Sequence, residues 1–175
     1  MANAGPHVIV VMGVSGSGKT TVGTKVAGLL GWEYADADAF HPPANIEKMS
    51  AGHPLNDADR MPWLQAIAGW IRAHLESGTP GVVSCSALKR SYRDLLTAGH
   101  PEVHVAYLDG DRDLIASRMR ERKGHFFQAE LLDSQFRDLE PPTPDENAVH
   151  VPITGTPDET AKLIVKALGL AAPGS

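Results

Sequence analysis

A glycine-rich segment between an apolar run and a helical pattern is the feature that most limits the fold of this chain. The run Val8–Met12 is continuously apolar and rich in β-branched residues, which is typical of a strand buried on both faces of a parallel sheet. Beyond the glycines, apolar residues recur at helical spacing from Val22 to Leu30, and Gly31 supplies a stop. A buried strand, a tight turn and a helix in this order predict an α/β domain.

The segment itself reads GVSGSGKT and fits the pattern G-x-x-x-x-G-K-[ST], the P-loop. In this pattern the glycines let successive backbone N–H groups point at a phosphate, the next helix offers the positive end of its dipole, and the lysine adds a mobile cation. A glycine-rich turn that matched by accident would need neither the strand nor the helix around it. We therefore predict nucleotide binding, with Thr20 as a magnesium ligand. The predicted nucleotide-binding residues of this segment are Gly13, Ser15, Gly16, Ser17, Gly18, Lys19, Thr20 and Thr21.

The rest of the chain alternates between strand and helix patterns. Further strands are expected at 33–35, 81–84, 103–108 and 148–152. Helices are expected from the prolines after His41 through Met49, and at 59–77, 89–98 and 111–121. A last helix follows Thr156, which forms a capping box with Glu159. This alternation predicts a doubly wound parallel five-stranded sheet with helices on both faces, in a single domain over residues 1–175.

The composition sets aside several classes of protein. Of 175 residues, 42% are hydrophobic and 21% are charged, which is typical of a globular chain rather than a disordered or membrane chain. A formal charge of −5 disfavours a protein that mainly binds nucleic acid or an anionic membrane surface. Cys85 is the single cysteine, which excludes an intrachain disulfide and favours a reducing compartment. Because the first residues lack a basic region and the apolar run is too short to span a bilayer, we expect a cytoplasmic protein.

Two aspartates are candidates for the metal and for the phosphoryl acceptor. The base-reading signature N-K-x-D of GTPases is absent from the sequence, and the strand ending at Ser84 is not followed by a carboxylate, so another acid must serve the magnesium. Asp36 and Asp38 end the second predicted strand and share one side if the segment is extended. One of them would hold Mg²⁺ through water and the other would meet the acceptor hydroxyl. A solvated acidic turn is the alternative; we assign Asp36 to the metal and Asp38 to the acceptor.

Four stretches of the chain carry a further signal. They are Met12–Thr20, Asp36–Leu64, Cys85–Leu96 and Arg122–Pro142. Together they resemble the gluconokinases of the small P-loop type, which are related in fold to shikimate and nucleoside monophosphate kinases. The block HPPANIEKMSAGHPLNDADRMPWL is the most specific part, and Ala37 just before it stands where relatives often have glycine. The resemblance implies a P-loop kinase fold with a mobile lid, a homodimer, and the ATP- and magnesium-dependent phosphorylation of D-gluconate at its 6-hydroxyl, giving 6-phosphogluconate and ADP.

A gluconate pocket needs a cation for the carboxylate and several hydrogen-bonding side chains for the hydroxyls. By the resemblance, the candidate acceptor-binding residues are Asp38, His41, Asn45, Lys48, Arg60, Ser86, Lys89, His125 and Gln135. Arg60 matches in position the substrate-binding arginine of the shikimate kinases. Plainer roles stay open: Arg60 as an ion pair on a helix surface, Lys48 and Lys89 as solvated cations, His41 as the residue that fixes a turn. Trp63 is expected in the core or in the pocket wall.

Arginines gather at the start of the last quoted stretch, at Arg118, Arg120 and Arg122. In the related kinases this region is a lid over ATP, where arginines neutralise charge on the transferred phosphoryl group. The lid is expected at about residues 122–135, with His125 either in the acceptor pocket or at the hinge. Arg118 and Arg122 are four residues apart and share a helical face, so Arg118 is predicted to bind the nucleotide, whereas Arg120 points elsewhere. The predicted catalytic residues are Lys19, Asp38 and Arg122.

Two other functions stay open at this point. A kinase for another small hydroxylated acid, such as shikimate, would share the fold and the phosphate chemistry, but the block His41–Leu64 speaks against it. A nucleotide-binding module without turnover is disfavoured because Lys19, Thr20 and Asp38 are all present.

Overall fold

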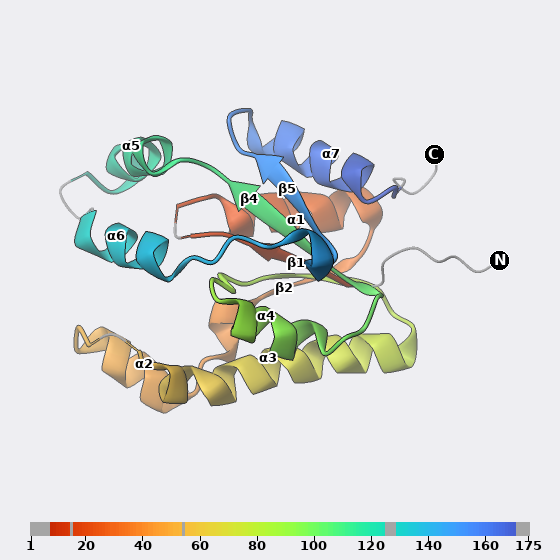
Figure 1. The fold of residues 1–175 in the computed structure, drawn as a ribbon, viewed down its shortest axis with the longest axis horizontal. Helices are drawn as coiled ribbons and strands as arrows, with labels where there is room; N and C mark the ends of the chain where they lie inside the picture. Colours follow the sequence, from red (N-terminus) through yellow and green to blue (C-terminus); the bar gives the residue numbers. More distant parts are fainter. Residues whose placement is uncertain (1–7, 15, 54, 125–128, 171–175) are drawn as a thin grey trace.

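A parallel sheet of five strands forms the centre of the computed structural model, which describes residues 8–14, 16–53, 55–124 and 129–170 (Figure 1). In the order in which they pair, the strands are β2 (Glu33–Asp36), β3 (Gly81–Ser84), β1 (Val8–Met12), β4 (Val103–Asp109) and β5 (Ala148–Pro152). Each neighbouring pair is parallel. The predicted α/β fold with a five-stranded parallel sheet is confirmed.

The apolar run predicted as a buried strand lies in the middle of this sheet. Val10 of β1 lies opposite Val83 of β3 on one side and Val105 of β4 on the other. All residues of β1 are buried. Because successive side chains of a strand point to opposite faces, Ile9 belongs to one hydrophobic cluster and Val10 to the other.

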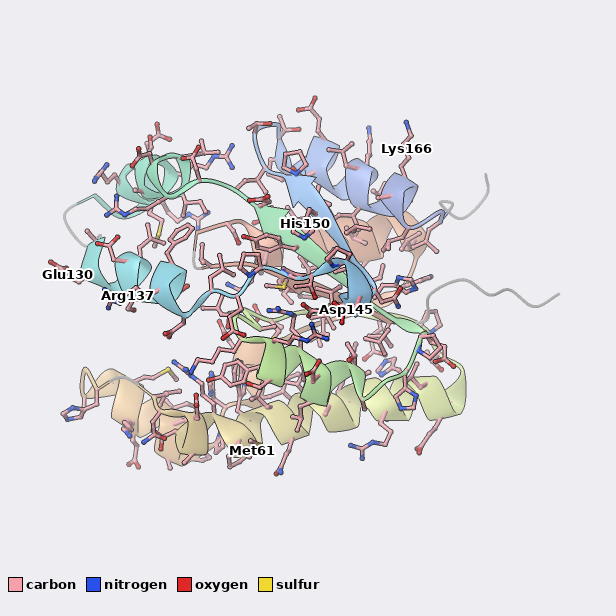
Figure 2. The ribbon with its side chains drawn as sticks, in the orientation of Figure 1. Met61, Glu130, Arg137, Asp145, His150 and Lys166 are labelled. Atoms are coloured by element: carbon pink, nitrogen blue, oxygen red, sulfur yellow. The ribbon has the colours of Figure 1, made fainter. Side chains whose placement is uncertain are left out.

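Helices cover both faces of the sheet, as a doubly wound fold requires (Figure 1). They are α1 (Lys19–Leu30), α2 (Pro43–Ser50), α3 (Asp57–Ser77), α4 (Arg90–Thr97), α5 (Arg112–Lys123), α6 (Ala129–Asp138) and α7 (Pro157–Ala167), with 3-10 turns η1 (Ala37–Phe40) and η3 (Pro144–Glu146). Helices α1, α5 and α7 pack in the cluster that contains Ile9, and α3 and α4 pack in the cluster that contains Val10. Lys166 on α7 and Met61 on α3 project away from the sheet on opposite sides of the molecule (Figure 2).

Most helices begin and end within two residues of the predicted limits. Helix α3 begins at Asp57, two residues earlier than expected, because Asn56 caps it. The Asn56 side chain accepts from the backbone N–H of Asp59 at 2.8 Å, and the Asp59 carboxylate accepts from the backbone N–H of Asn56 at 2.9 Å. This reciprocal capping box satisfies N–H groups that the helix itself leaves free.

The segment after Asp36 differs from the prediction. Residues Ala37–Phe40 are not extended; they form η1, because the Asp36 side chain accepts from the backbone N–H of Asp38 at 2.9 Å and caps the turn. The premise that Asp36 and Asp38 share one side of a strand is therefore wrong, although both still lie at the carboxyl end of β2.

Helix α6 has no counterpart in the sequence analysis, which assigned most of its length to the lid. The predicted lid at 122–135 spans the end of α5 and the first part of α6, and its residues 125–128 lie outside the described residues. An ion pair between Arg112 and Asp133 connects α5 to α6, and Leu132 is buried in the cluster that contains Ile9. Closure of this region stays a prediction.

A buried ion pair holds the chain that leaves α6. Arg93 of α4 is 1% exposed, and its Nε donates to Oε1 of Glu146 at 2.6 Å. Its terminal nitrogens donate to the backbone carbonyls of Ala87, Leu88 and Glu140. One side chain thus joins α4, the segment after β3 and the segment between α6 and β5.

Replacing this arginine should therefore destabilise the fold strongly. Arg93→Ala leaves the Glu146 carboxylate buried without its partner, which costs about 3–5 kcal/mol of unfolding free energy. Urea denaturation measures the change, and Arg72→Ala, at an exposed position of α3, is the matched control, expected to stay within ~0.5 kcal/mol. Equal unfolding midpoints for the two variants would contradict a supporting role for the ion pair.

Candidate active site

The predicted site residues meet at the carboxyl edge of the sheet. The P-loop follows β1, η1 follows β2, and Ser86 lies just after β3. Because the strands are parallel, these connections leave the sheet at the same edge. Ligands of open α/β sheets bind at this edge, where the strand order changes direction.

The P-loop and α5 enclose a small cavity. Gly16 has a φ of +84° and Gly18 a φ of +91°, a backbone conformation that favours glycine. A Cβ on Gly16 would lie 2.5 Å from Cγ of Met119 on α5, so the Met119 side chain would have to shift. The cavity has a volume of about 210 Å³ and is lined by Gly16, Gly18, Lys19, Thr20, Thr21, Met119 and Arg122. The structure therefore brings Arg122 to the predicted phosphate-binding residues.

The other predicted nucleotide-binding residues lie elsewhere. Gly13 and Ser17 pack together at the base of the loop, where a Cβ on Gly13 would lie 2.4 Å from Oγ of Ser17. Ser15 lies outside the described residues. Arg118 is half-buried on α5 and, among the described residues, is not part of the cavity lining. Its contact with the nucleotide stays a prediction.

Lys19 supplies positive charge at the cavity. Burial lowers the pKa of its ammonium group, and the Asp38 carboxylate opposes this most strongly, followed by Cys85 and Asp36. Cys85 is buried, and this burial raises the pKa of its thiol to about 12, so it stays protonated at neutral pH. The negative charges that act on Lys19 are therefore those of Asp36 and Asp38.

Asp36 connects the phosphate cavity to the stretch Asp36–Leu64, which we call the acceptor segment. Its Oδ2 accepts from Oγ1 of Thr20 at 3.1 Å, while its Oδ1 accepts from the backbone N–H of Asp38 at 2.9 Å. Hydroxyl and carboxylate oxygens are the ligands that Mg²⁺ prefers. In the described part of the chain, three or more His, Cys, Asp or Glu side chains do not gather into a metal-binding group. A magnesium ion at Thr20 and Asp36 would take its remaining ligands from water and phosphate.

A hydrogen-bonded relay behind the P-loop was not predicted. The Tyr34 hydroxyl donates to Oγ of Ser84 at 2.9 Å, and this Oγ donates to the backbone carbonyl of Lys19 at 2.8 Å. Gly23 permits the approach, because a Cβ there would lie 2.4 Å from the same Oγ. The relay fixes the first turn of α1 against β2 and β3. The sequence signal for it is weak: a serine ends the strand and a glycine interrupts the helix.

The three cations predicted to bind the acceptor have different partners. Lys48 forms an ion pair with Asp59 at 2.5 Å, and Lys89 forms one with Asp57 at 3.1 Å. Arg60 instead donates from Nη1 to the phenol oxygen of Tyr92 at 3.0 Å. Among the described residues, Arg60 is not within ion-pair distance of a carboxylate. The surface ion pair considered for Arg60 is therefore absent from this part of the chain, and Lys48 and Lys89 are paired rather than simply solvated.

His41 and Trp63 form a stacked pair within the acceptor segment. Their rings stack with centroids 4.4 Å apart, and the Trp63 indole donates to the backbone carbonyl of Ala37 at 2.7 Å. The Asn45 amide donates to Nδ1 of His41 at 3.3 Å and to the backbone carbonyl of Asp59 at 2.9 Å. Trp63 is 4% exposed, as expected for a core or wall residue. The block that suggested gluconokinases thus folds into one connected unit.

Burial lowers the pKa of His41, an effect that Asp38 opposes and Arg60 reinforces. The imidazole is therefore neutral at pH 7. Because Nδ1 accepts from Asn45, the ring hydrogen sits on Nε2. Of the other acceptor candidates, Ser86 is half-buried next to β3, Gln135 is half-buried on α6, and His125 lies outside the described residues.

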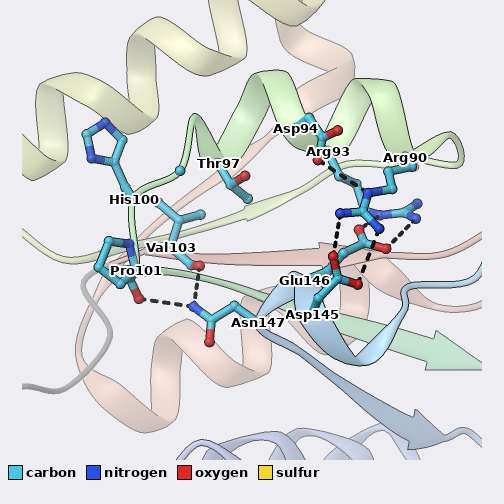
Figure 3. Close-up of a pocket in the computed structure, with 11 residues that line it drawn as sticks. Arg90, Arg93, Asp94, Thr97, His100, Pro101, Val103, Asp145, Glu146 and Asn147 are labelled. Carbon is cyan, nitrogen blue, oxygen red and sulfur yellow. Dashed lines mark hydrogen bonds and ion pairs between the residues drawn. The ribbon is translucent and has the colours of Figure 1, made fainter.

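A larger cavity, of about 370 Å³, lies away from the P-loop, between α4, η3 and the amino ends of β4 and β5 (Figure 3). Its charged groups satisfy one another: Arg90 meets Asp145 at 2.7 Å, and Arg93 meets Glu146. The Asn147 amide donates to two backbone carbonyls there. The smaller cavity, with Lys19 and Arg122, is therefore the candidate active site.

Comparison with known proteins identifies the family. A family model described as "Shikimate kinase" matches residues 15–168. The gluconokinase of Gluconobacter oxydans (strain 621H) is 45% identical over 161 residues, which cover 92% of this chain and 90% of that protein. The thermoresistant gluconokinase of Escherichia coli (strain K12) is 46% identical over 165 residues, covering 91% and 94%. This chain belongs to the shikimate kinase family and, within it, to the gluconokinases.

Solved structures agree with membership of the gluconokinases. A gluconokinase from Sinorhizobium meliloti 1021 superposes with a TM-score of 0.85 at 44% identity, covering 95% of this chain and 94% of that one. The shikimate kinase from Aquifex aeolicus superposes with a TM-score of 0.55 at 16% identity, which shows the shared P-loop kinase fold alone. None of the helices in the described ranges is long and apolar enough to cross a membrane.

Substitution of two glycines tests whether the P-loop cavity binds ATP. Gly16→Ala should weaken ATP binding by about tenfold or more, because a Cβ at positive φ would collide with Met119 and distort the cavity. Gly28→Ala, in the α1 helix that follows the P-loop and with open space around its Cβ position, should leave ATP binding unchanged and add ~0.5–1 kcal/mol of stability. Titration calorimetry with an ATP analogue checks both. Unchanged affinity in Gly16→Ala would contradict the assignment of the cavity.

Proposed function

We propose that this protein transfers the γ-phosphoryl group of ATP to the 6-hydroxyl of D-gluconate, giving 6-phosphogluconate and ADP. Its relatives named gluconokinase support the reaction class. The observation that carries the assignment of the acceptor site is how its three candidate cations are paired. Lys48 and Lys89 each form an ion pair with an aspartate, whereas among the described residues Arg60 does not.

Arg60 is the residue that would bind the gluconate carboxylate. Lys48 and Lys89 already face carboxylates, so an anionic substrate would have to compete with an aspartate at either lysine. The Arg60 guanidinium, in the described part of the chain, hydrogen-bonds to a phenol and not to a carboxylate. A planar guanidinium also matches a carboxylate in a bidentate geometry.

The sugar chain would then extend from Arg60 toward the P-loop. Burial lowers the pKa of His41, Asp38 opposes this effect and Arg60 reinforces it, so the charges of both residues act on the imidazole. Its Nε2–H is a hydrogen-bond donor for a substrate hydroxyl. In gluconate the carboxylate and the 6-hydroxyl are at opposite ends, so binding the carboxylate at Arg60 directs the primary hydroxyl to Asp38.

Asp38 would act as the acceptor base. It is exposed, and among the charged groups near Lys19 its carboxylate acts most strongly on the Lys19 ammonium at the cavity. It accepts the hydroxyl proton as the oxygen–phosphorus bond forms and the bond to the leaving ADP oxygen breaks. Lys19 and Arg122, both in the cavity lining, stabilise the negative charge on the transferred group.

We assign the magnesium ion that accompanies ATP to Thr20 and Asp36. The fit rests on their 3.1 Å hydrogen bond and on their hard oxygen atoms. Bound there, the ion would neutralise charge on the β- and γ-phosphates. Asp36 would keep its second oxygen on the Asp38 backbone and so hold the base in place.

A shikimate kinase activity has less support. The solved shikimate kinases share the fold at 16% and 21% identity, whereas the curated gluconokinase relatives reach 45–48% in the three strongest cases. We also propose a single domain over residues 1–175, a lid near 122–135 with Arg118 on the nucleotide, a homodimer, and a cytoplasmic location. These rest on the family resemblance and on the single buried cysteine.

The acceptor assignment predicts a large difference between two acids. ADP release with gluconate should exceed ADP release with shikimate by about a hundredfold or more, since a pocket built to hydrogen-bond specific hydroxyls rejects analogues that leave its groups unpaired. A coupled ADP assay with each acid, and with no acceptor, measures this. Equal rates with the two acids would contradict gluconate as the substrate, and equal rates with and without acceptor would contradict a kinase.

The two aspartates should respond differently to the same change. Asp38→Asn keeps the shape but removes the base, so kcat should fall by about 10²–10⁴ while ATP binding persists. Asp36→Asn should raise the magnesium concentration needed for half-maximal rate, since one metal-facing oxygen is replaced by an amide. Rates measured against both gluconate and Mg²⁺ separate the effects. A near-normal kcat for Asp38→Asn at saturating Mg²⁺ would overturn its assignment.

A further inference from the structure

The Arg60 side chain belongs to a chain of two hydrogen bonds, in which Arg60 donates to Tyr92 and Tyr92 donates to Asp57. Tyr92 lies in α4 and is 8% exposed, so its ring packs in the core between α3 and α4. Its phenol has a single hydrogen, and that hydrogen is donated to Oδ1 of Asp57 at 2.5 Å. The oxygen lone pairs are thereby left for Arg60, whose Nη1 donates at 3.0 Å.

The same ring also lies against both cations of this group. The Arg60 guanidinium carbon is 5.9 Å from the ring centroid, and the Lys89 ammonium nitrogen is 5.6 Å from it. Both are within the range of cation–π attraction. Lys89 completes the group by pairing with the Asp57 carboxylate. Tyr92 therefore contacts Arg60, Asp57 and Lys89 together.

Because the Tyr92 phenol is uncharged, its hydrogen bond does not neutralise the Arg60 guanidinium. Burial and the hydrogen bond to Asp57 raise the pKa of Tyr92, so the phenol stays neutral at working pH. Asp57, held by Tyr92 and Lys89, is kept from pairing directly with Arg60. The guanidinium is thus held in place by a neutral acceptor and keeps its charge for an anionic ligand.

We propose that Tyr92 is a positioning residue for the acceptor: it orients Arg60 toward the substrate carboxylate and keeps Asp57 from neutralising it. This rests on the proposed function, in which Arg60 binds that carboxylate. Tyr92 itself touches neither the reacting hydroxyl nor the phosphate. Without the Tyr92 hydroxyl, Arg60 loses its hydrogen-bond acceptor and reorients toward the nearby carboxylates of Asp57 and Asp59, on which its charge already acts.

The test is Tyr92→Phe, which keeps the ring and its packing. We expect the KM for gluconate to rise about tenfold, the factor that ~1.4 kcal/mol gives, while kcat and the KM for ATP stay within about twofold. Tyr107→Phe, a change of another buried tyrosine in the same cluster, is the matched control and should leave all constants unchanged. Thermal unfolding of each variant verifies that the fold is retained.

A double-mutant cycle shows whether Tyr92 acts through Arg60. In an Arg60→Gln background, Tyr92→Phe should change the KM for gluconate by less than about twofold. The same tenfold rise in that background, or an unchanged KM in Tyr92→Phe alone, would overturn the positioning role. A wild-type protein inactive on gluconate would overturn the proposed function and this role with it, whereas an active wild type with an unaffected Tyr92→Phe variant overturns this role alone.

Discussion

The carboxylate of Asp36 is the contact on which the arrangement of the site depends. One oxygen receives the Thr20 hydroxyl, at the start of the helix that follows the P-loop, and the other caps the turn that carries Asp38. Phosphate cavity and acceptor segment come from different strands, and this side chain fixes the distance between them. The parallel order β2-β3-β1 makes the contact feasible, because it places the ends of β1 and β2 on one edge with β3 between them.

The charged side chains around the acceptor segment are paired selectively. The carboxylates of Asp57 and Asp59 are each paired with a lysine. The arginine is held by a phenol, whose hydrogen bond fixes its direction without cancelling its charge. A site that binds an anion needs a cation in this state, since a prior ion pair would have to be broken at the expense of binding energy.

Much of this was predictable from local patterns. The buried run of β1, the P-loop glycines and the capping residues of the last helix are determined by neighbours in sequence, and the structure has them where they were expected. The turn η1 was mispredicted because its geometry depends on a side chain that caps its own backbone two residues later. Helix α6 was not predicted because the resemblance assigned most of its length to the lid, although Leu132 and Phe136 are four residues apart and share a helical face.

The contacts that the site residues make were harder to predict from the sequence than the helices and strands. Tyr92 meets Arg60 across 32 positions in sequence, and Tyr34 meets Ser84 across 50, so these contacts follow from helix and strand packing rather than from any motif. Ser86, Gln135 and Arg118 illustrate the converse: the resemblance points to them, while the structure gives only their place on the fold.

In the proposed complex the substrate has one direction, with its carboxylate at Arg60 and its far end at Asp38. The position of the new phosphate ester tests that direction most directly, by proton-coupled ³¹P nuclear magnetic resonance of the product made from gluconate and ATP. Phosphate on the primary 6-oxygen is coupled to the two hydrogens of one carbon and gives a triplet, which the account predicts. A doublet, from an ester on a secondary carbon, would contradict it.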